Sequence, residues 1–401
     1  MRPMPLRAVS IFLHAYVGWR IAPELGALWA SVAFVALLVV SVITLPYGMR
    51  ARLTGTSRSL HRLLAWLGLI GMGLFSSLFV LTLLRDLALL GLAVATWRLP
   101  NLIASAGDIA TVSARLVALV AAAVTLLGFV NARRTAAVVR VDVPIAGLPA
   151  ALDGFTIAQI SDIHIGPTIR RPYVEAIVAA VNRQGADMVA VTGDLVDGSV
   201  KELAGHVAPL AELRSRDGTF FVTGNHEYYS GAAAWVEELR RLGVTVLMNE
   251  HVVLRRGDAA VVVAGVTDFG AGHFDPAEAS DPRRAIAGSP PAALRVLLAH
   301  QPRSATAAES AGFDLQLSGH THGGQFLPWN LLVRLQQPFT AGLKRWHRMW
   351  VYTSRGTGYW GPPKRFGAPS EITLLRLVPA RVEAPGRHRR ASRPATAGAR
   401  L

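Results

Sequence analysis

The chain has 401 residues, of which 51% are hydrophobic, and its mean hydropathy is +0.35. This composition excludes a chain that is mainly disordered, and it predicts membrane segments beside a soluble part. The sequence contains no cysteine, which excludes disulfides, thiolate metal sites and cysteine nucleophiles. The formal net charge of +15 favours an anionic partner, either nucleic acid or a membrane surface. The location of the charge decides between them.

The apolar runs lie in the first third of the chain. Residues 25–46 and 63–84 carry no charge, and each run is long enough to cross a hydrocarbon core of about 30 Å as a helix. Residues 109–130 predict a third span, with a single arginine near one end. Residues 6–22 fit either a short span or an interfacial helix. Residues 87–96 are too short to span and are expected at the membrane surface or as a re-entrant segment.

Basic residues flank these runs. They gather at residues 49–62 and 132–140, and the positive-inside rule places both groups, and the part of the chain that follows, on the cytoplasmic side. Further arginines lie in residues 379–401, whose Pro, Ala and Gly content predicts a disordered basic tail. We therefore predict a multi-pass protein of the cell inner membrane, with a transmembrane region of three to four helices over residues 1–131 and a linker over residues 132–149.

The remainder of the chain has a different pattern. Short β-rich runs alternate with stretches of helical periodicity, which are expected at residues 173–182, 232–242 and 276–287. This alternation predicts a layered α/β domain over residues 150–378. The predicted strands are residues 155–160, 188–192, 219–223, 261–266, 294–299 and 315–318.

Polar residues that can bind metal follow most of these strands. In open α/β folds the carboxyl ends of neighbouring strands form the ligand-binding edge of the sheet. Residues two apart on an extended segment point to the same side, so Asp162 can act with His164, and His320 with His322. A set of carboxylate, carboxamide and imidazole groups suits Mn, Fe or Zn. The candidate ligands are Asp162, His164, Asp194, Asn225, His300, His320 and His322.

Five short motifs contain these residues, in the order DIH, GDLVD, GNHE, LLAHQP and GHTHGGQ. In this order they resemble the five signature blocks of the calcineurin-like binuclear metallophosphoesterases. The resemblance covers roughly residues 150–378, and segments such as SRGTGYWGPP are similar to the bacterial, membrane-associated branch of the family. It implies a layered metallophosphoesterase β-sandwich flanked by helices, with an α-helical transmembrane region before it.

The resemblance also implies the role of each residue. Two divalent metal ions (Mn, Fe or Zn) would share a hydroxide that attacks the phosphorus of a phosphoester. His226 would steady the phosphate and protonate the leaving group, which makes it the expected catalytic residue. Asp197 and Glu227 would orient the ligands or His226. Asp162, His164 and His322 would hold one ion, Asn225, His300 and His320 the other, and Asp194 would bridge the two.

Three further features have two interpretations each. Arg355 and Lys364, in loops near the end of the domain, are either phosphate contacts or solvated cations. Residues 326–333 form an apolar stretch that begins four residues after His322. This stretch either covers the edge of the sheet as part of the core or lies on lipid headgroups. In the second case the substrate would be a phosphoester linked to a lipid.

Two other functions remain open. A regulatory protein could keep this fold and bind metal or phosphate without turnover, although the complete ligand set and His226 favour an enzyme. A phosphodiesterase for nucleotides or nucleic acid would make use of the positive charge, but this charge lies in the tail and beside the spans rather than along the catalytic motifs. An anionic membrane surface explains the same charges. The predicted partners are therefore a phosphoester substrate and a membrane, with no specific nucleic acid.

Overall fold

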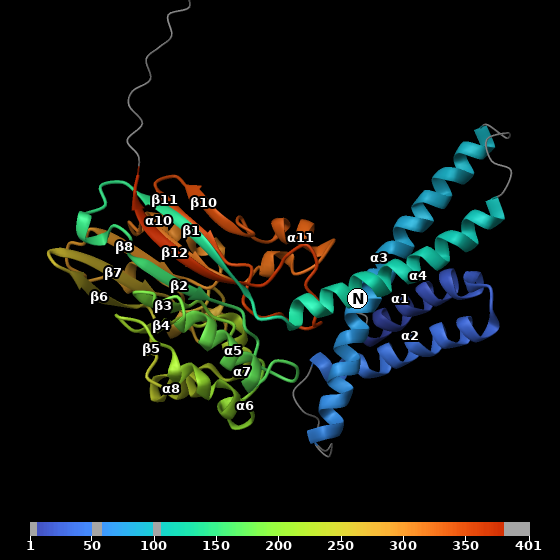
Figure 1. The fold of residues 1–401 in the computed structure, drawn as a ribbon, viewed down its shortest axis with the longest axis horizontal. Helices are drawn as coiled ribbons and strands as arrows, with labels where there is room; N and C mark the ends of the chain where they lie inside the picture. Colours follow the sequence, from blue (N-terminus) through green and yellow to red (C-terminus); the bar gives the residue numbers. More distant parts are fainter. Residues whose placement is uncertain (1–5, 50–57, 99–105, 381–401) are drawn as a thin grey trace, which may run out of the picture.

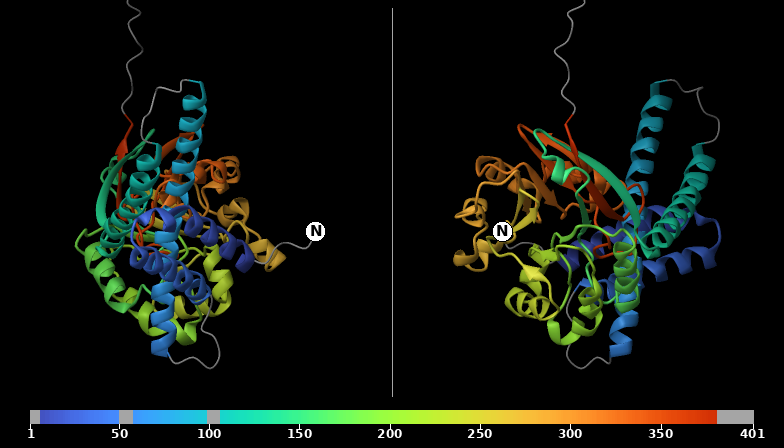
Figure 2. Two further views of the ribbon diagram at one scale, coloured as in Figure 1. Left: turned by 90° about the vertical axis from the view of Figure 1, so that its right-hand side faces the viewer. Right: turned by 60° about the vertical axis from the view of Figure 1, so that its left-hand side comes forward.

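A group of long helices and a two-sheet domain make up the part of the chain that the computed structural model describes, residues 6–49, 58–98 and 106–380 (Figure 1). The long helices come first in the sequence and lie on one side of the domain (Figure 1 and the right view of Figure 2). The long helices are α1 Leu6–Ile21, α2 Leu28–Met49, α3 Arg58–Arg98 and α4 Ala106–Arg133. The helices of the domain are α5 Arg171–Asn182, α6 Val200–Val207, α7 Asn225–Ser230, α8 Ala232–Arg241, α9 Pro282–Ile286, α10 Ala305–Ser310 and α11 Trp329–Leu332.

Within the described residues, three helical segments are long and apolar enough to cross a membrane: Leu28–Gly48, Ser59–Arg98 and Asp108–Arg133. They correspond to the three predicted spans. Helix α1 has 16 residues, which is a length of about 24 Å at 1.5 Å per residue and shorter than a hydrocarbon core. Most of the basic segment 49–62 and all but the first two residues of the predicted tail fall outside the described residues.

Residues 87–96 are not a re-entrant segment, so this part of the prediction is wrong, and their place at the membrane surface stays a prediction. They continue α3, which runs without a break for 41 residues. The charged pair Arg85 and Asp86 does not end the helix, because helical hydrogen bonds join backbone groups and both side chains find partners on neighbouring helices. Arg20 of α1 donates to the two carboxylate oxygens of Asp86 at 2.8 and 2.9 Å, and Arg85 Nη2 donates to the Ala110 carbonyl of α4 at 2.9 Å.

The domain is a sandwich of two sheets. Their strand orders are β1-β12-β2-β3-β4-β5 and β10-β11-β9-β8-β7-β6. Strands β2 to β5 run parallel to one another, as do β7, β8, β9 and β11, so the carboxyl ends in each set lie along one edge. The strands are β1 Ala137–Ile145, β2 Thr156–Ile160, β3 Met188–Val191, β4 Thr219–Phe221, β5 Thr245–Val246, β6 Glu250–Arg256, β7 Ala259–Gly265, β8 Leu294–Leu298, β9 Leu315–Ser318, β10 Gly342–Trp346, β11 Met349–Thr353 and β12 Glu371–Pro379.

Three apolar layers hold the domain together. Side chains such as Ile157, Val263 and Leu375 fill the space between the two sheets and are fully buried. Helices α5, α6 and α8 cover the outer face of the first sheet, where Trp235 of α8 is buried. Helices α9 and α10 cover the outer face of the second sheet. The predicted α/β sandwich flanked by helices is therefore confirmed.

Two predictions about secondary structure need correction. The predicted linker, residues 132–149, contains strand β1, which pairs with β12 in parallel from Ala137 opposite Glu371 to Ile145 opposite Pro379. Half-buried apolar side chains along β1 pack against the core, so the strand belongs to the sheet. Residues 276–287 form two short helical turns instead of one helix. Pro282 starts the second turn, because proline has no backbone N–H to continue a helix and suits a first helical position.

Candidate metal centre

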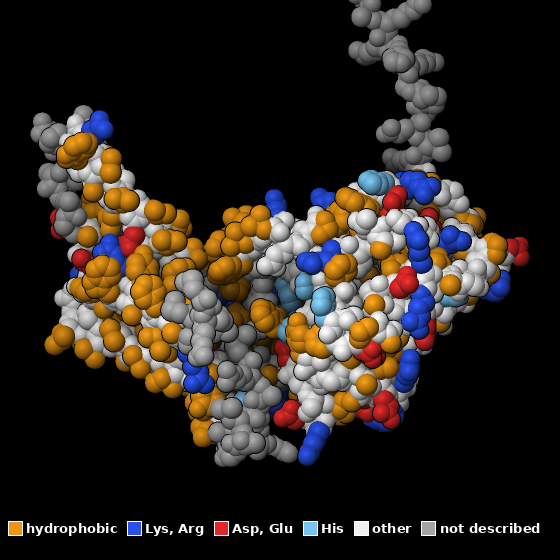
Figure 3. Space-filling view, turned by 180° about the vertical axis from the view of Figure 1, so that it is seen from behind, with side chains coloured by type: hydrophobic (Ala, Val, Ile, Leu, Met, Phe, Trp, Pro, Cys, Tyr) orange, Lys and Arg blue, Asp and Glu red, His pale blue; other side chains and the backbone are white. Residues whose placement is uncertain are grey.

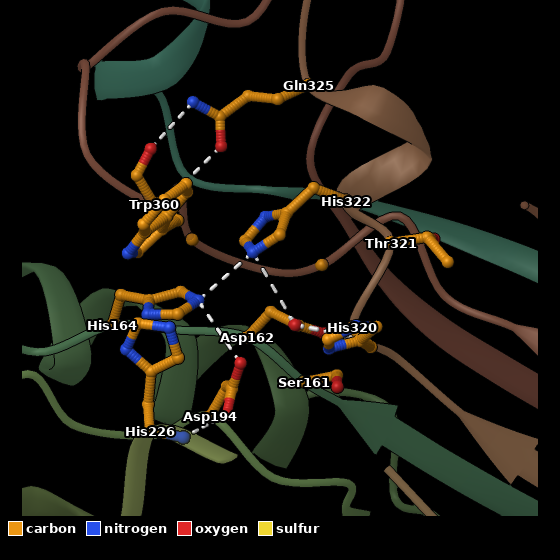
Figure 4. Close-up of polar contacts among 12 residues, drawn as sticks. Ser161, Asp162, His164, Asp194, His226, His320, Thr321, His322, Gln325 and Trp360 are labelled. Carbon is orange, nitrogen blue, oxygen red and sulfur yellow. Dashed lines mark hydrogen bonds and ion pairs between the residues drawn. The ribbon is translucent and has the colours of Figure 1, made fainter. Parts of the chain in front are cut away.

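The predicted ligands lie in loops that directly follow strands, at the edge where the two sheets meet. The turn after each strand changes the direction of the chain and turns the polar side chains toward one another (Figure 4). The loops after β2 and β3 carry Asp162, His164 and Asp194, and Asn225 is the first residue of α7, which follows β4. His300, His320 and His322 come after β8 and β9.

Most of these residues have an unusual backbone conformation. The backbone angle φ is positive, between +50° and +70°, at Asp162, His164, Asp194, His320 and His322. Such a conformation costs a residue other than glycine on the order of 1–3 kcal/mol, and it persists only where the surrounding structure holds it. Here the loops brace one another: the backbone N–H of His320 donates to Asp162 Oδ1 at 2.9 Å, and that of His164 to the Asp194 carbonyl at 3.1 Å. Strain of this kind is typical of a functional site.

One group of donor atoms comes from Asp162, His164 and His322, which are all buried. Nε2 of His322 lies 3.0 Å from Nε2 of His164 and 3.5 Å from Oδ1 of Asp162. Nε2 of His164 also lies 3.9 Å from Oδ2 of Asp194. The other nitrogen of His164, Nδ1, is 3.0 Å from Oδ1 of Asp197. This contact leaves Nε2 as the nitrogen that faces the group, as in many histidine ligands of metals.

A second group consists of Asp194, His300 and His320. Nε2 of His300 lies 3.1 Å from Oδ2 of Asp194 and 3.2 Å from Nδ1 of His320. Nδ1 of His300 donates to the Thr192 carbonyl at 2.7 Å, so Nε2 is again free to face the group. Asp194 Oδ2 is therefore within reach of both groups of donors.

Asn225 supplies an independent sign that this arrangement suits an ion. Its Oδ1 atom is buried and has no hydrogen-bond partner, although a buried acceptor without a partner is rare in folded proteins. Asn225 lies beside Asp194, because the backbone N–H of the next residue, His226, donates to Asp194 Oδ1 at 2.9 Å. The oxygen and nitrogen donors present are those that Mn, Fe and Zn bind. The residues thus fit a metal site.

His226 and Asp197 form a pair at the rim of the two groups. His226 Nδ1 lies 2.6 Å from Asp197 Oδ1, the same oxygen that contacts His164. Burial lowers the pKa of His226, but the hydrogen bond to Asp197 and the charges of Asp194 and Asp197 outweigh burial and raise this pKa to about 9. Burial raises the pKa of Asp197, and the two histidines more than reverse that effect, so this carboxyl group is ionised. A protonated imidazole held by a carboxylate can supply a proton.

His226 also lies within metal-binding reach of His164 and Asp194. The side chain is also partly exposed and has two aromatic neighbours, with ring centroids 5.3 Å away at Tyr229 and 5.8 Å away at Trp360. A hollow in the surface contains histidine side chains and lies beside hydrophobic ones (Figure 3). We therefore place His226 on the side of the site that faces an incoming molecule.

Glu227 joins two of the loops from beneath. Its carboxylate is fully buried and accepts hydrogen bonds from four backbone N–H groups. These N–H groups belong to Asp194, Leu195, Val196 and Gly224. Glu227 thus fixes the loop of Asp194 against the loop of Asn225, in line with the orienting role predicted for it.

Lys364 fits neither of its two predicted roles, both roles of the partly exposed Arg355 stay predictions, and one further cation was missed. Lys364 neither contacts the donor groups nor faces solvent, because its ammonium group is buried against α3 and α4. Arg355 is paired with Glu371, its Nε donating to Oε2 at 2.8 Å. The missed residue is Arg365, a buried side chain whose Nη2 lies 3.0 Å from Nδ1 of His322. The sequence shows only adjacent cations at 364 and 365, with no sign of which one faces the site.

Gln325, the last residue of the GHTHGGQ motif, has a role that the sequence did not reveal. Its amide nitrogen donates to the carbonyls of Trp360 and Pro362 at 2.9 and 3.0 Å. Its amide oxygen accepts from the Trp360 backbone N–H at 2.9 Å, and Figure 4 shows both contacts with Trp360. A glutamine amide imitates a backbone peptide in such a pairing. Gln325 therefore ties the loop that carries Trp360 to the loop that carries the two histidines.

Comparison with known proteins shows which family has these features. The sequence model described as "Calcineurin-like phosphoesterase" matches residues 155–324. The chain is 40% identical over 277 residues to "Transmembrane protein with metallophosphoesterase domain" of Bos taurus, a match that covers 66% of this chain and 62% of the relative. It is 42% identical over 228 residues to an uncharacterized metallophosphoesterase of Helicobacter pylori (56% of this chain, 60% of the relative), and 34% identical over 223 residues to one of Aquifex aeolicus (55% and 84%). The chain thus spans about three-fifths of the first two relatives. It belongs to the calcineurin-like metallophosphoesterase family.

Proposed function

We propose that the protein is a hydrolase of phosphoesters that uses two divalent metal ions, anchored in the membrane by its N-terminal helices. The observation that carries the proposal is the convergence of two groups of donor atoms, with Asp194 Oδ2 within reach of both, beside an Asn225 oxygen without a partner. Asp162, His164 and His322 would hold one ion, and Asn225, His300 and His320 the other. Asp194 would bridge them. Mn, Fe and Zn all suit these donors.

When bound, the two ions would polarise the phosphoryl oxygens and activate the attacking water. The chain's own residues supply the proton and the geometry. Asp197 keeps His226 protonated and fixes its Nδ1, so Nε2 is the nitrogen that can give a proton to the leaving oxygen. The same carboxylate orients His164, and Glu227 holds the loops of Asp194 and Asn225 at a fixed distance. The proton donor is thereby fixed relative to the ligands.

A pair of histidine variants tests this function. His226→Ala should keep the bound metal and lower kcat by about 10²–10⁴-fold, because it removes the proton donor but no ligand. His273→Ala removes an exposed histidine and should leave kcat unchanged. The assay is the hydrolysis of a generic phosphomonoester and phosphodiester by the full-length protein with added Mn²⁺. Equal kcat values for the two variants, or loss of metal from His226→Ala, would contradict the assigned role.

Membrane association is indicated by the apolar helices and by the transmembrane relative, and contacts between the helices and the domain suggest a substrate. Trp329 of α11 donates from Nε1 to Ser76 Oγ at 2.8 Å, and Ser76 lies in the middle of the apolar part of α3. Beside Trp329, Leu331, Leu332 and Leu335 are 59%, 47% and 83% exposed. If α3 crosses the bilayer, Ser76 lies within the bilayer, and these leucines lie close to it because they are near Trp329 in the sequence. Exposed apolar side chains at that position suit lipid contact.

We propose on this basis that the substrate phosphate belongs to a lipid or a lipid-linked molecule. Of the stretch predicted to lie on headgroups, Phe326 is buried as core, and the exposed leucines that follow carry the proposal. The test compares a short-chain and a long-chain version of one phosphoester with the wild type and a Leu331→Ser, Leu335→Ser double variant in lipid nanodiscs. The variant should lose rate on the long-chain substrate only, which makes the short-chain substrate the internal control. Equal rates of the wild type on both substrates would favour a water-soluble phosphoester.

We further propose that the protein is a multi-pass protein of the inner membrane with its domain in the cytoplasm. Arg133, Arg134 and Arg140 support this orientation, since they follow the end of the last apolar segment directly. A fluorescent reporter that folds only in the cytoplasm, fused after residue 380, should be bright. A reporter enzyme active only outside the cytoplasm and fused at the same place should be silent, and the opposite pair of results would overturn the orientation.

A further inference from the structure

The loop between Gly358 and Phe366 lies between the membrane helices and the metal centre. Lys364 projects from it into the space between α3 and α4 and is 1% exposed. Its ammonium group donates to the Gly73 carbonyl at 2.8 Å and the Ser77 hydroxyl at 2.5 Å, both of α3, and to the Thr125 hydroxyl of α4 at 3.1 Å. All three acceptors are neutral. The position of Lys364 thus depends on both helices together.

The next residue, Arg365, has its backbone attached to α4. Its N–H donates to the Gly128 carbonyl at 2.8 Å, and its carbonyl accepts from Asn131 Nδ2 at 3.3 Å. Gly128 permits this close approach, because a Cβ atom there would lie 2.7 Å from Cγ of Lys364. Any larger residue at position 128 would therefore push the loop away from α4.

The side chain of Arg365 points the other way, into the metal centre. It is 1% exposed, and its Nη1 donates to the His322 carbonyl at 2.9 Å while Nη2 lies 3.0 Å from Nδ1 of the same residue. Nη1 also donates to the Arg355 carbonyl at 2.8 Å. The guanidinium group therefore holds the backbone of His322 through its carbonyl, and Nε2 of the His322 ring faces Asp162 and His164.

We propose that Arg365 is a positioning residue for the ligand His322, and that Lys364 makes this position depend on how α3 packs against α4. Arg365 joins the membrane helices to the metal centre, since it contacts α4 through its backbone and His322 through its side chain. Ligand geometry must be held within about 0.5 Å for a metal site to function, so a small shift of α4 is enough to matter. The membrane helices then regulate the metal centre as well as anchor it. This inference rests on the proposed metal-dependent function.

The test uses full-length protein in lipid nanodiscs and measures metal binding directly. Gly128→Val fills the space that Lys364 occupies, and Gly91→Val is its matched control, because a Cβ at Gly91 of α3 would have no neighbour within 4 Å. Lys364→Met keeps most of the stem and removes the ammonium group. Arg365→Met removes the contact with His322. Each protein is dialysed against limiting Mn²⁺, and the bound metal per chain and the EPR signal of a coupled Mn²⁺ pair are recorded.

We expect Arg365→Met to lower the binding affinity for one of the two ions by about 10–100-fold, the usual effect of removing a group that orients a ligand. The coupled EPR signal should give way to that of a single ion, because the other ion does not depend on His322. Gly128→Val and Lys364→Met should change metal binding in the same direction by a smaller factor. Gly91→Val should match the wild type.

Different results separate this proposal from the proposed function. A wild-type protein that binds no metal would contradict the proposed function. If the wild type holds two ions and Lys364→Met and Gly128→Val hold them with unchanged affinity, the helices do not regulate the site. If Arg365→Met loses both ions equally, Arg365 supports the domain as a whole and is not a positioning residue for His322. If Gly128→Val does not fold, metal binding by Lys364→Met alone decides whether the helices regulate the site.

Discussion

Replacing Glu227 by glutamine should destabilise the domain by an amount that follows from its hydrogen bonds. Oε1 of Glu227 accepts from the N–H groups of Leu195 and Val196 at 2.7 and 3.3 Å, and Oε2 from those of Asp194 and Gly224 at 2.9 and 2.6 Å. A glutamine keeps one oxygen for two of these donors and turns an amide N–H₂ group toward the other two. A buried donor without an acceptor costs about 1–3 kcal/mol, so the two together cost roughly 2–6 kcal/mol.

The assay is thermal unfolding of the metal-free protein at a pH above the pKa of Glu227, which burial and the charge of Asp194 raise to about 7. For a domain of this size, 1 kcal/mol corresponds to about 2–4 °C, so the expected decrease in Tm is roughly 4–24 °C. Glu237→Gln on α8 changes an exposed glutamate and is the control, with an expected effect within about 0.5 kcal/mol. An unchanged Tm for Glu227→Gln would contradict an ionised Glu227 that accepts all four hydrogen bonds, because a protonated Glu227 already has a donor at one of its two oxygens.

Two further substitutions give expected outcomes at the metal centre. Asp194→Asn removes the charge shared by both donor groups, and we expect loss of both metal and hydrolysis, measured as metal content and turnover of the purified protein; a variant that keeps both ions would contradict the bridging role. Asp197→Asn weakens the hydrogen bonds to His164 and His226 together. We expect about 10–100-fold weaker metal binding as well as slower turnover. A change in metal binding alone, or in turnover alone, would show that Asp197 orients only one of these two histidines.

The strands that carry the site could be predicted because their local pattern and their position in the fold agree. Runs such as 188–192 and 315–318 are apolar, short and followed by polar residues, and buried parallel strands have this pattern. The apolar helices were predictable for a similar reason, since lipid-facing helices need long uncharged runs. Position along the chain therefore placed Asp162, Asp194 and His300 at strand ends before any contact was known.

Features that depend on contacts between distant residues could not be predicted. Strand β1 forms part of the sheet only because β12, more than 200 residues later, pairs with it. The continuity of α3 past Arg85 and Asp86 depends on Arg20 and Ala110 in other helices. Lys364 and Arg365 look alike in the sequence, and the packing of the loop between α4 and His322 alone gives them opposite roles. Local pattern carries no information about such partners.

The most direct test of the account is a metal titration of the purified full-length protein. The protein is first freed of metal with a chelator, and Mn²⁺ is then added stepwise while bound metal per chain and hydrolysis of a generic phosphoester are measured on the same samples. We expect no hydrolysis without metal, and a rise in hydrolysis that is complete when two ions are bound per chain. Hydrolysis that survives chelation, or a chain that binds no metal, would contradict it.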